Sequence, residues 1–204
     1  MRAHTQPVHP LLVPEISLLV AADVVALWEA MESERGAQSE PPFWAAAWPG
    51  GQALARYVLD HPGLVAGRAV LDLGSGSGLV AVAAALAGAR SVVASEIDPF
   101  GKVAIGVNAE VNGVAATISV VGDVLDGEPP PAAAVLAGDV CYDRAMTERV
   151  LPFLDAARAA GAEVLIGDPG RQYLPADRLE GVSVVDVPDT EGPLVRRTTV
   201  WRLP

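Results

Sequence analysis

The sequence predicts an α/β fold of three layers around one doubly wound sheet. From residue 68 onward, apolar stretches of strand length alternate with stretches of helical pattern, an order typical of right-handed βαβ crossovers in a parallel sheet. The segment 69–96 shows this order as strand, glycine-rich turn, helix and second strand. The last two strands are separated only by DTEGPL at 189–194, which leaves no room for a helix. They are therefore expected to form an antiparallel hairpin at the sheet edge.

Composition limits the class of protein. The chain has 204 residues, 51% of them apolar and 19% charged, enough for one folded domain with a proper core. The formal net charge is −11 and basic residues form no run, which disfavours nucleic acid and favours a cationic ligand or a basic partner segment. No apolar stretch approaches the ~20 residues of a membrane span. A lone cysteine and no signal-peptide pattern predict a cytoplasmic protein.

The chain is expected to divide into an N-terminal arm and helix at 1–40, packed on the main domain at 41–204. Residues 1–14 contain three prolines and two histidines and predict a loose arm. His4 and His9 lack cysteine or acidic partners at ligand spacing, so a solvated arm is favoured over a metal site. We expect no metal.

Two helices are predicted before the alternating region. Apolar residues near helical spacing predict one at 21–34, followed by a Gly-, Ser- and Pro-containing linker. A break at the Pro-Gly-Gly of 49–51 precedes an amphipathic helix at 52–60. Phe43 and Trp48 stand just before that helix, where aromatic side chains either wall a pocket or fill the core. The sequence leaves both readings open.

The alternating region supplies the remaining elements. The predicted strands are 69–74, 91–96, 117–122, 132–138, 163–168, 181–187 and 196–202. The predicted helices are 78–88, 99–112 and 144–160, with a short one at 175–180. Together they describe a Rossmann-like seven-stranded sheet, mostly parallel, with helices on both faces.

The first strand of the sheet ends in a glycine-rich turn, DLGSGSG at 72–78. Ligands of open parallel sheets bind outside the carboxyl ends of the strands, and glycines let a ligand approach the backbone closely. Leu79 stands where the dinucleotide fingerprint G-x-G-x-x-G requires its third glycine. Asp72 before the turn suits a cationic amino-acid group better than a pyrophosphate. The alternative is a turn with a structural role alone.

Acidic residues follow the next strands as well. Glu96, 22 residues past Gly74, is placed to accept the hydroxyls of a ribose, while Asp98 is expected to cap the following helix. Asp123 after the third strand is placed to accept from the exocyclic amine of a purine, unless it belongs to a surface turn. Cys141 has no nearby histidine to activate it and is interpreted as structural.

At these residues the chain resembles class I S-adenosylmethionine-dependent methyltransferases. More narrowly, it resembles the seven-strand protein lysine methyltransferases related to the enzyme that modifies the electron transfer flavoprotein beta subunit. The resemblance rests on PPFWAAAWPGGQALARYVLD (41–60), VLDLGSGSG (70–78), ASEIDP (94–99), GDVCYD (138–143) and LIGDPGR (165–171).

The resemblance implies a role for each candidate residue. The methionine portion of the cofactor would be held by Asp72, Gly74, Ser75, Gly76 and Gly78. Glu96 would hold the ribose, Asp123 the adenine, and Trp48 would line the cofactor pocket. Asp139 and Tyr142 occupy the segment that faces the transferred methyl group, so Asp139 counts among both the cofactor-binding and the catalytic candidates. Its expected task is to orient the acceptor amine rather than to act as a strong base.

The resemblance implies a protein-lysine N-methyltransferase that uses S-adenosylmethionine, with the electron transfer flavoprotein beta subunit as suspected partner. Related DNA-adenine and glutamine enzymes carry Asn/Asp-Pro-Pro-Tyr/Phe after strand four; the DVCY of 139–142 lacks those prolines, which argues against a flipped base. Three alternatives remain: N-methylation of a small amine or heterocycle, a catalytically silent S-adenosylmethionine-binding module, and a NAD-dependent oxidoreductase, which Leu79 and Asp72 disfavour.

Overall fold

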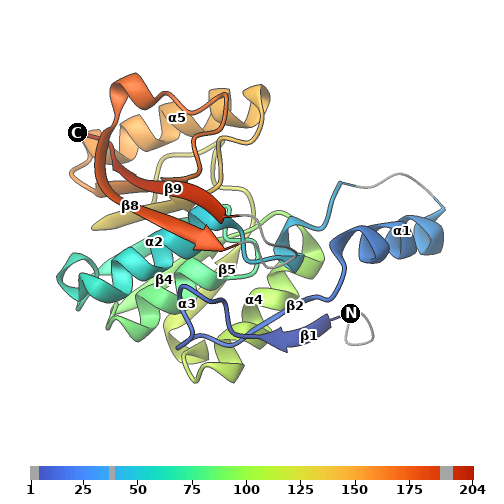
Figure 1. Ribbon diagram of the computed structural model, residues 1–204. Coiled ribbons are helices and arrows are strands. Elements are labelled where there is room, and N and C mark those ends of the chain that lie inside the picture. The colour runs from blue at the N-terminus through green and yellow to red at the C-terminus, as the bar shows by residue number, and fades with distance from the viewer. Residues whose placement is uncertain (1–4, 37–39, 189–194) are drawn as a thin grey trace.

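A mixed seven-stranded sheet forms the centre of the molecule (Figure 1). The computed structural model describes residues 5–36, 40–188 and 195–204. The strands of the sheet are β3 (Ala69–Leu73), β4 (Ser91–Ser95), β5 (Ile118–Val121), β6 (Ala134–Gly138), β7 (Glu163–Asp168), β8 (Glu180–Pro188) and β9 (Val195–Arg202). Their order is β5-β4-β3-β6-β7-β9-β8. The first five are parallel, and β9 runs antiparallel to both β7 and β8, which confirms the predicted hairpin at the edge. The predicted turn of that hairpin, 189–194, lies outside the described residues.

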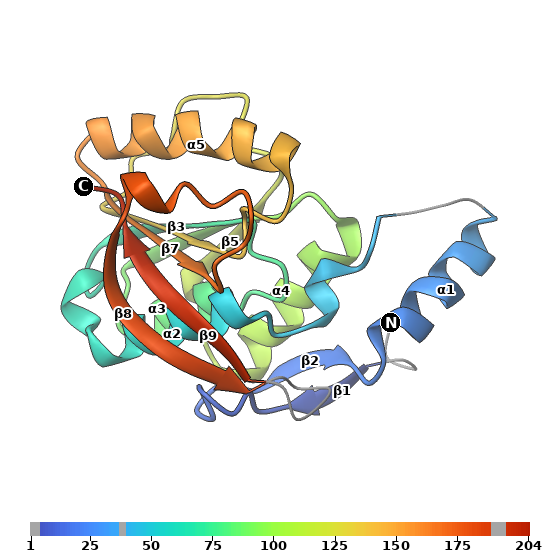
Figure 2. The same ribbon diagram turned by 45° about the horizontal axis from the view of Figure 1, so that its top comes forward.

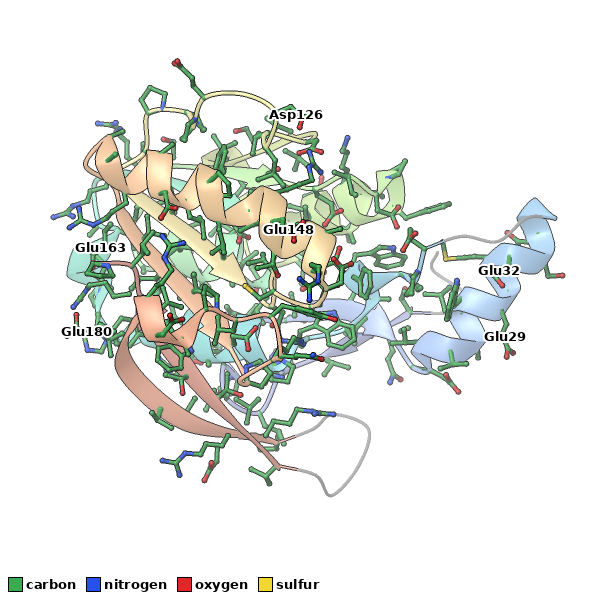
Figure 3. The ribbon with its side chains drawn as sticks, turned by 90° about the horizontal axis from the view of Figure 1, so that it is seen from above. Glu29, Glu32, Asp126, Glu148, Glu163 and Glu180 are labelled. Carbon is green, nitrogen blue, oxygen red and sulfur yellow. The ribbon has the colours of Figure 1, made fainter. Side chains whose placement is uncertain are left out.

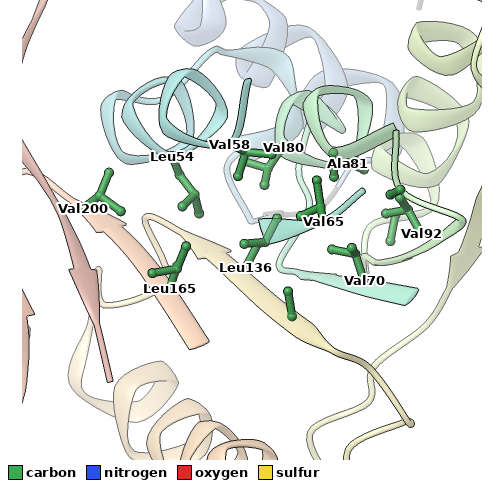
Figure 4. Packing of buried hydrophobic residues seen from close by; sticks show 14 of the residues in the cluster. Leu54, Val58, Val65, Val70, Val80, Ala81, Val92, Leu136, Leu165 and Val200 are labelled. Atoms are coloured by element: carbon green, nitrogen blue, oxygen red, sulfur yellow. The ribbon is translucent and has the colours of Figure 1, made fainter. Parts of the chain in front are cut away.

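Helices cover both faces of the sheet, as Figure 2 shows. The helices α2 (Pro49–Asp60), α3 (Leu79–Leu86) and α4 (Pro99–Val111) lie on one side, and α5 (Arg144–Ala159) lies on the other. Consecutive strand residues point to opposite layers: Val70 packs beneath α2 and α3, whereas Leu71 packs beneath α5. Burial on both faces explains why the strands read as continuous apolar runs. Figure 4 shows the first layer, in which Leu54 and Val80 meet Leu136.

Two predictions about helices are wrong: the start of α2 and the short helix at 175–180. The Pro-Gly-Gly segment is not a break but the first turn of α2, with Pro49 at a position where its missing N–H costs nothing. The predicted helix at 175–180 is only a single 3₁₀ turn, Ala176–Arg178, because β8 already begins at Glu180. The other elements from residue 68 onward lie within three residues of their predicted bounds.

The N-terminal segment is not the loose arm that its prolines suggested. Strand β1 (Thr5–Val8) pairs antiparallel with β2 (Leu18–Ala21), and the two side chains of Val13 and Ile16 between them are fully buried. These residues pack against Leu79 of α3, so tertiary burial overrides the local proline signal. The division of the chain at residue 40 stays a prediction.

The N-terminal hairpin is also tied to the glycine-rich turn through α4. The fully buried Asn108 accepts from the Leu19 backbone N–H over 2.8 Å and donates to the Ser77 carbonyl over 2.7 Å. Asn112, one turn later, bonds the backbone of Ser17 in both directions. After the hairpin, α1 (Val24–Arg35) begins at the capping side chain of Asp23 and close to its predicted start.

None of the helices in the described parts of the chain is long and apolar enough to cross a membrane. The same residues contain no group of three or more His, Cys, Asp and Glu side chains that would hold a metal ion. His9 contacts the Pro14 carbonyl at 3.0 Å, and His4 lies outside the described residues.

Candidate functional site

A cavity of about 330 Å³ opens at the carboxyl ends of β3, β4 and β6. Most of the residues that the sequence singled out line it, from several separate segments: Trp48, Gly74, Gly76, Glu96, Asp123, Asp139 and Tyr142. The remaining three, Asp72, Ser75 and Gly78, are buried behind this lining. The cavity therefore lies where a doubly wound sheet holds its ligand.

Asp72 supports the glycine-rich turn from beneath. Its Oδ2 accepts from the Ser75 hydroxyl over 2.5 Å and from the Ala81 backbone N–H, in the first turn of α3, over 3.0 Å. Gly74, Gly76 and Gly78 all have positive φ, which costs other residues energy, so this backbone course requires glycine. Burial raises the pKa of Asp72 to about 7, against the hydrogen bonds from Ser75 and Ala81, which lower it.

Glu96 connects the end of β4 to the same turn. Its Oε2 accepts from the Gly76 N–H over 2.8 Å and its Oε1 from the Asp98 N–H over 2.8 Å. Burial raises the pKa of Glu96, although these backbone donors stabilise its charged form. Gly101 leaves room for this carboxylate, because a Cβ there would lie 2.8 Å from Glu96 Cγ. Asp98 caps α4 through the Phe100 N–H, as predicted.

Asp123 lines the cavity beyond the end of β5 and is paired with an arginine that sequence reasoning missed. The Arg149 Nη2 donates to Asp123 Oδ2 over 2.9 Å and to Asp126 over 2.8 Å. The Leu125 backbone N–H donates to Asp123 Oδ1 over 2.9 Å. This backbone bond, followed by the one from Arg149, lowers the pKa of Asp123.

Asp139 is constrained by its backbone conformation and by two hydrogen bonds to its carboxylate. Its φ of 60° is the one positive value at a non-glycine position among the described residues. The Gly51 N–H, at the start of α2, donates to its Oδ2 over 2.7 Å, and the Arg171 Nη1 donates to its Oδ1 over 2.5 Å. Burial raises the pKa of Asp139, while the charge of Arg171 is the largest influence that lowers it.

Glycines allow α2 to approach the ends of β6 and β7 closely enough for that contact. A Cβ on Gly50 would lie 2.1 Å from the Gly167 carbonyl oxygen, and a Cβ on Gly138 would lie 2.9 Å from Gly51 Cα. The glycines at 50–51, 138 and 167 are thus needed for close packing of three distant segments.

Three aromatic side chains form one wall of the cavity. The Phe43 ring lies 6.1 Å from that of Trp48 and 5.2 Å from that of Tyr142, centroid to centroid. The Trp48 indole N–H donates to the Phe43 carbonyl, which fixes the ring. Phe43 and Trp48 are 39% and 36% exposed, so they wall the pocket rather than fill the core. The neighbouring Trp44 is the buried core aromatic.

Three further reactive or charged side chains, those of Cys141, Asp168 and Glu15, have structural surroundings. Cys141 is fully buried, and burial raises the pKa of its thiol to about 11, so it is unreactive at neutral pH. Asp168, at the end of β7, is buried and accepts from the backbone N–H groups of Gly170 and Arg171. Glu15 forms an ion pair with Arg56 and does not line the cavity.

Comparison with known proteins identifies the family of this chain. The family model described as Ribosomal protein L11 methyltransferase matches residues 53–138. The electron transfer flavoprotein beta subunit lysine methyltransferase of Xenopus laevis is 37% identical over 82% of this chain and 68% of its own length. The chain belongs to that lysine methyltransferase family.

The family relative from Danio rerio is 42% identical over 78% of this chain, and the human one is 38% identical over the same share. The chain spans 62% of the Danio rerio protein and 61% of the human one.

Solved structures share the fold. Magnesium protoporphyrin IX methyltransferase from Synechocystis PCC 6803 with bound SAM gives a TM-score of 0.56 at 16% identity, covering 76% of this chain and 79% of that one. An RNA methyltransferase from Salinibacter ruber in complex with S-adenosyl-L-homocysteine gives 0.51 at 22% identity, covering 74% and 91%.

Proposed function

We propose that this chain is an S-adenosylmethionine-dependent protein-lysine N-methyltransferase that acts on an electron transfer flavoprotein beta subunit. The observation that carries the proposal is the cavity at the ends of β3, β4 and β6, into which Glu96, Asp123 and Asp139 all face. Membership of the lysine methyltransferase family supports the same reaction and acceptor.

The residues on one side of the cavity fit S-adenosylmethionine. Glu96 keeps free lone pairs after its two backbone bonds and would accept the two ribose hydroxyls. The open backbone at Gly74 and Gly76 leaves room for the amino-acid portion. Asp123 would accept from the adenine amine, held in its charged form by the Leu125 backbone N–H and by Arg149. The cavity volume lies within the range of small-molecule sites.

Asp72, Ser75 and Gly78 would contribute indirectly, because they are buried behind the lining. The Asp72 carboxylate joins the turn to α3 and so determines where the Gly74 and Gly76 backbone faces the ligand. Trp48 would cover the cofactor from the α2 side, since its ring is held at the cavity wall by the Phe43 carbonyl.

The bound cofactor would supply an activated methyl group on its sulfonium. The chain itself would supply proximity and orientation at the other side of the cavity. Asp139 would accept a hydrogen bond from the acceptor amine and aim its lone pair, with the Tyr142 hydroxyl as a second partner. Phe43 and Tyr142 of the aromatic wall would cover the aliphatic stem of the lysine and exclude water from the amine.

Two surface properties favour a protein acceptor over a small amine. The rim is open, because Tyr142 and Phe43 are 42% and 39% exposed. The chain also carries a formal net charge of −11, with acidic side chains spread over several elements; Figure 3 shows Glu29 and Glu32 along α1 and Glu148 on α5. Such a surface attracts a basic segment around the target lysine.

The test is methyl transfer from labelled S-adenosylmethionine to purified electron transfer flavoprotein, run beside a cell extract. Label is expected on the beta subunit. Glu96→Gln is the control, and loss of the charged ribose acceptor should weaken cofactor binding about tenfold. Label on a small molecule would indicate the small-amine reaction. Tight cofactor binding without any label would indicate a silent binding module.

A further inference from the structure

Arg171 occupies an unusual place in the cavity wall. It follows β7 in the chain, lines the cavity, and has a side chain that is 23% exposed. Its Nη1 contacts Asp139 Oδ1 at 2.5 Å, and the Asp139 side chain is only 10% exposed. A permanent positive charge thus lies directly against the carboxylate that faces the acceptor side of the cavity.

The position of Arg171 is determined from behind. The fully buried Asp168 accepts from the Gly170 and Arg171 backbone N–H groups, both over 2.7 Å, and its second oxygen lies 3.4 Å from Arg171 Nη1. The guanidinium is therefore anchored by one buried acid and presented to another.

The position of Asp139 is determined from three directions. Its backbone has a left-handed φ of 60°, which persists only where surrounding contacts enforce it. Its N–H donates to the Gly167 carbonyl, and its carboxylate receives the Gly51 N–H as well as Arg171. Strain of this kind at a residue in a cavity wall points to a functional requirement on where its carboxylate lies.

We propose that Arg171 is a positioning residue that keeps the Asp139 carboxylate charged, aimed into the cavity and electrically balanced, so that the acceptor ammonium gives its proton to solvent and enters as the neutral amine. The proposal rests on the methyl transfer proposed above. A lone carboxylate would retain an ammonium ion, which has no lone pair to react. A carboxylate already paired with a guanidinium accepts a hydrogen bond from a neutral amine but holds a cation less strongly.

Removal of Arg171 should act in one direction on the pH dependence. Burial raises the pKa of Asp139 and the charge of Arg171 opposes this, so without Arg171 the carboxylate protonates at higher pH. An unbalanced Asp139 also raises the pKa of a bound amine. Both effects move the acidic limb of the rate profile upward. Other charged or titratable groups nearby stay the same in the comparison: Glu96, Asp123, Arg149 and Tyr142 in the wall, with Cys141 and Asp168 behind it.

The experiment compares the full chain with Arg171→Gln and Arg171→Lys. In Arg171→Gln the acidic limb of kcat should move up by about one pH unit, with turnover at pH 7 about tenfold lower and the rates converging at higher pH. Arg171→Lys keeps the charge and should restore at least half of the shift. Arg178→Gln, which breaks the exposed ion pair with Asp155 away from the cavity, is the matched control and should leave the limb in place.

A second readout does not depend on activity. Carbon-13 NMR of aspartate carboxyl groups, with Asp139 assigned by its loss in Asp139→Asn, should show its titration midpoint move upward in Arg171→Gln. An unmoved midpoint in a folded Arg171→Gln protein, or parallel pH profiles of all variants, would overturn the role of Arg171. Failure of the unsubstituted chain to methylate any protein would instead overturn the proposed function, while the NMR titration would still test the Arg171–Asp139 pair.

Discussion

The two sides of the cavity hold their carboxylates by different means. On the side proposed for the cofactor, Glu96 is held by backbone N–H groups of the glycine-rich turn and of its own loop. On the side proposed for the acceptor, Asp139 is held by a guanidinium 32 residues away and by an N–H 88 residues away. The first arrangement is built within one βαβ unit, and the second is assembled from three distant segments.

The two sides of the cavity should therefore differ in how well they tolerate changes in packing. A site made of one turn survives as long as that turn folds, whereas a site made of three segments depends on how closely those segments pack. The acceptor side should therefore respond strongly to changes in packing that leave the cofactor side intact.

The largest effect should come from adding a methyl group where α2 meets β7. In Gly50→Ala the new Cβ would lie 2.1 Å from the Gly167 carbonyl oxygen, so we expect a loss of about 3 kcal/mol in the free energy of unfolding. Gly106→Ala in α4 is the matched control, because a Cβ there meets nothing within 4 Å and should stabilise by about 0.5–1 kcal/mol. Urea denaturation of both variants measures this, and equal stabilities would show that the close approach is not required.

The same difference explains what the sequence revealed. The seven strands and the turn at 72–78 were predictable because their signals are local: apolar runs, glycines, and an acid near the end of each of the five parallel strands. The roles of Glu96 and Asp139 in the reaction stay predictions. Asp139 drew attention through its position after a strand, but its pairing with Arg171 was not predictable, because no local pattern joins residues 32 positions apart.

The N-terminal hairpin was missed for a related reason. Its prolines indicate a loose arm when read locally, whereas burial of Val13 and Ile16 depends on the surface of α2 and α3, which a local pattern does not reveal. The Pro-Gly-Gly of α2 was misread as a break because glycine usually marks one, whereas here it permits the contact with β6 and β7.

Asp139→Asn should lower turnover and leave cofactor binding largely unchanged. Asparagine tolerates the left-handed backbone at this position, so the fold should persist. Without the charged acceptor for the amine, turnover should fall about 100-fold, a typical loss for a positioned polar group. Cofactor affinity, measured by calorimetry, should stay within about threefold. A parallel loss of affinity would show that the two sides are not separable, and unchanged turnover would remove Asp139 from the mechanism.

Asp72, which lies beneath the cofactor side of the cavity, should make the free energy of unfolding depend on pH. Burial raises the pKa of Asp72 to about 7, so the native state binds a proton that the unfolded chain, with a pKa near 3.9, has already lost. Stability from this group is full below pH ~4 and is lost as the pH rises toward 7. Asp72→Asn keeps an oxygen for Ser75 and Ala81 without this titration. The free energy of unfolding of the unsubstituted chain should therefore fall by about 3 kcal/mol relative to Asp72→Asn between pH 4.5 and 8.

The smallest effect should come from Glu15, which belongs to neither side of the cavity. Its carboxylate is 50% exposed and pairs with Arg56 at 2.7 Å, and Arg56 also pairs with Asp60 one helical turn away. Because Arg56 keeps that second partner, Glu15→Gln should cost at most about 0.5 kcal/mol of stability, as is usual for an exposed ion pair. Turnover and cofactor affinity should match those of the unsubstituted chain. A drop in turnover at unchanged stability would mean that the N-terminal hairpin reaches the acceptor side of the cavity. The acceptor side would then be assembled from four segments of the chain instead of three.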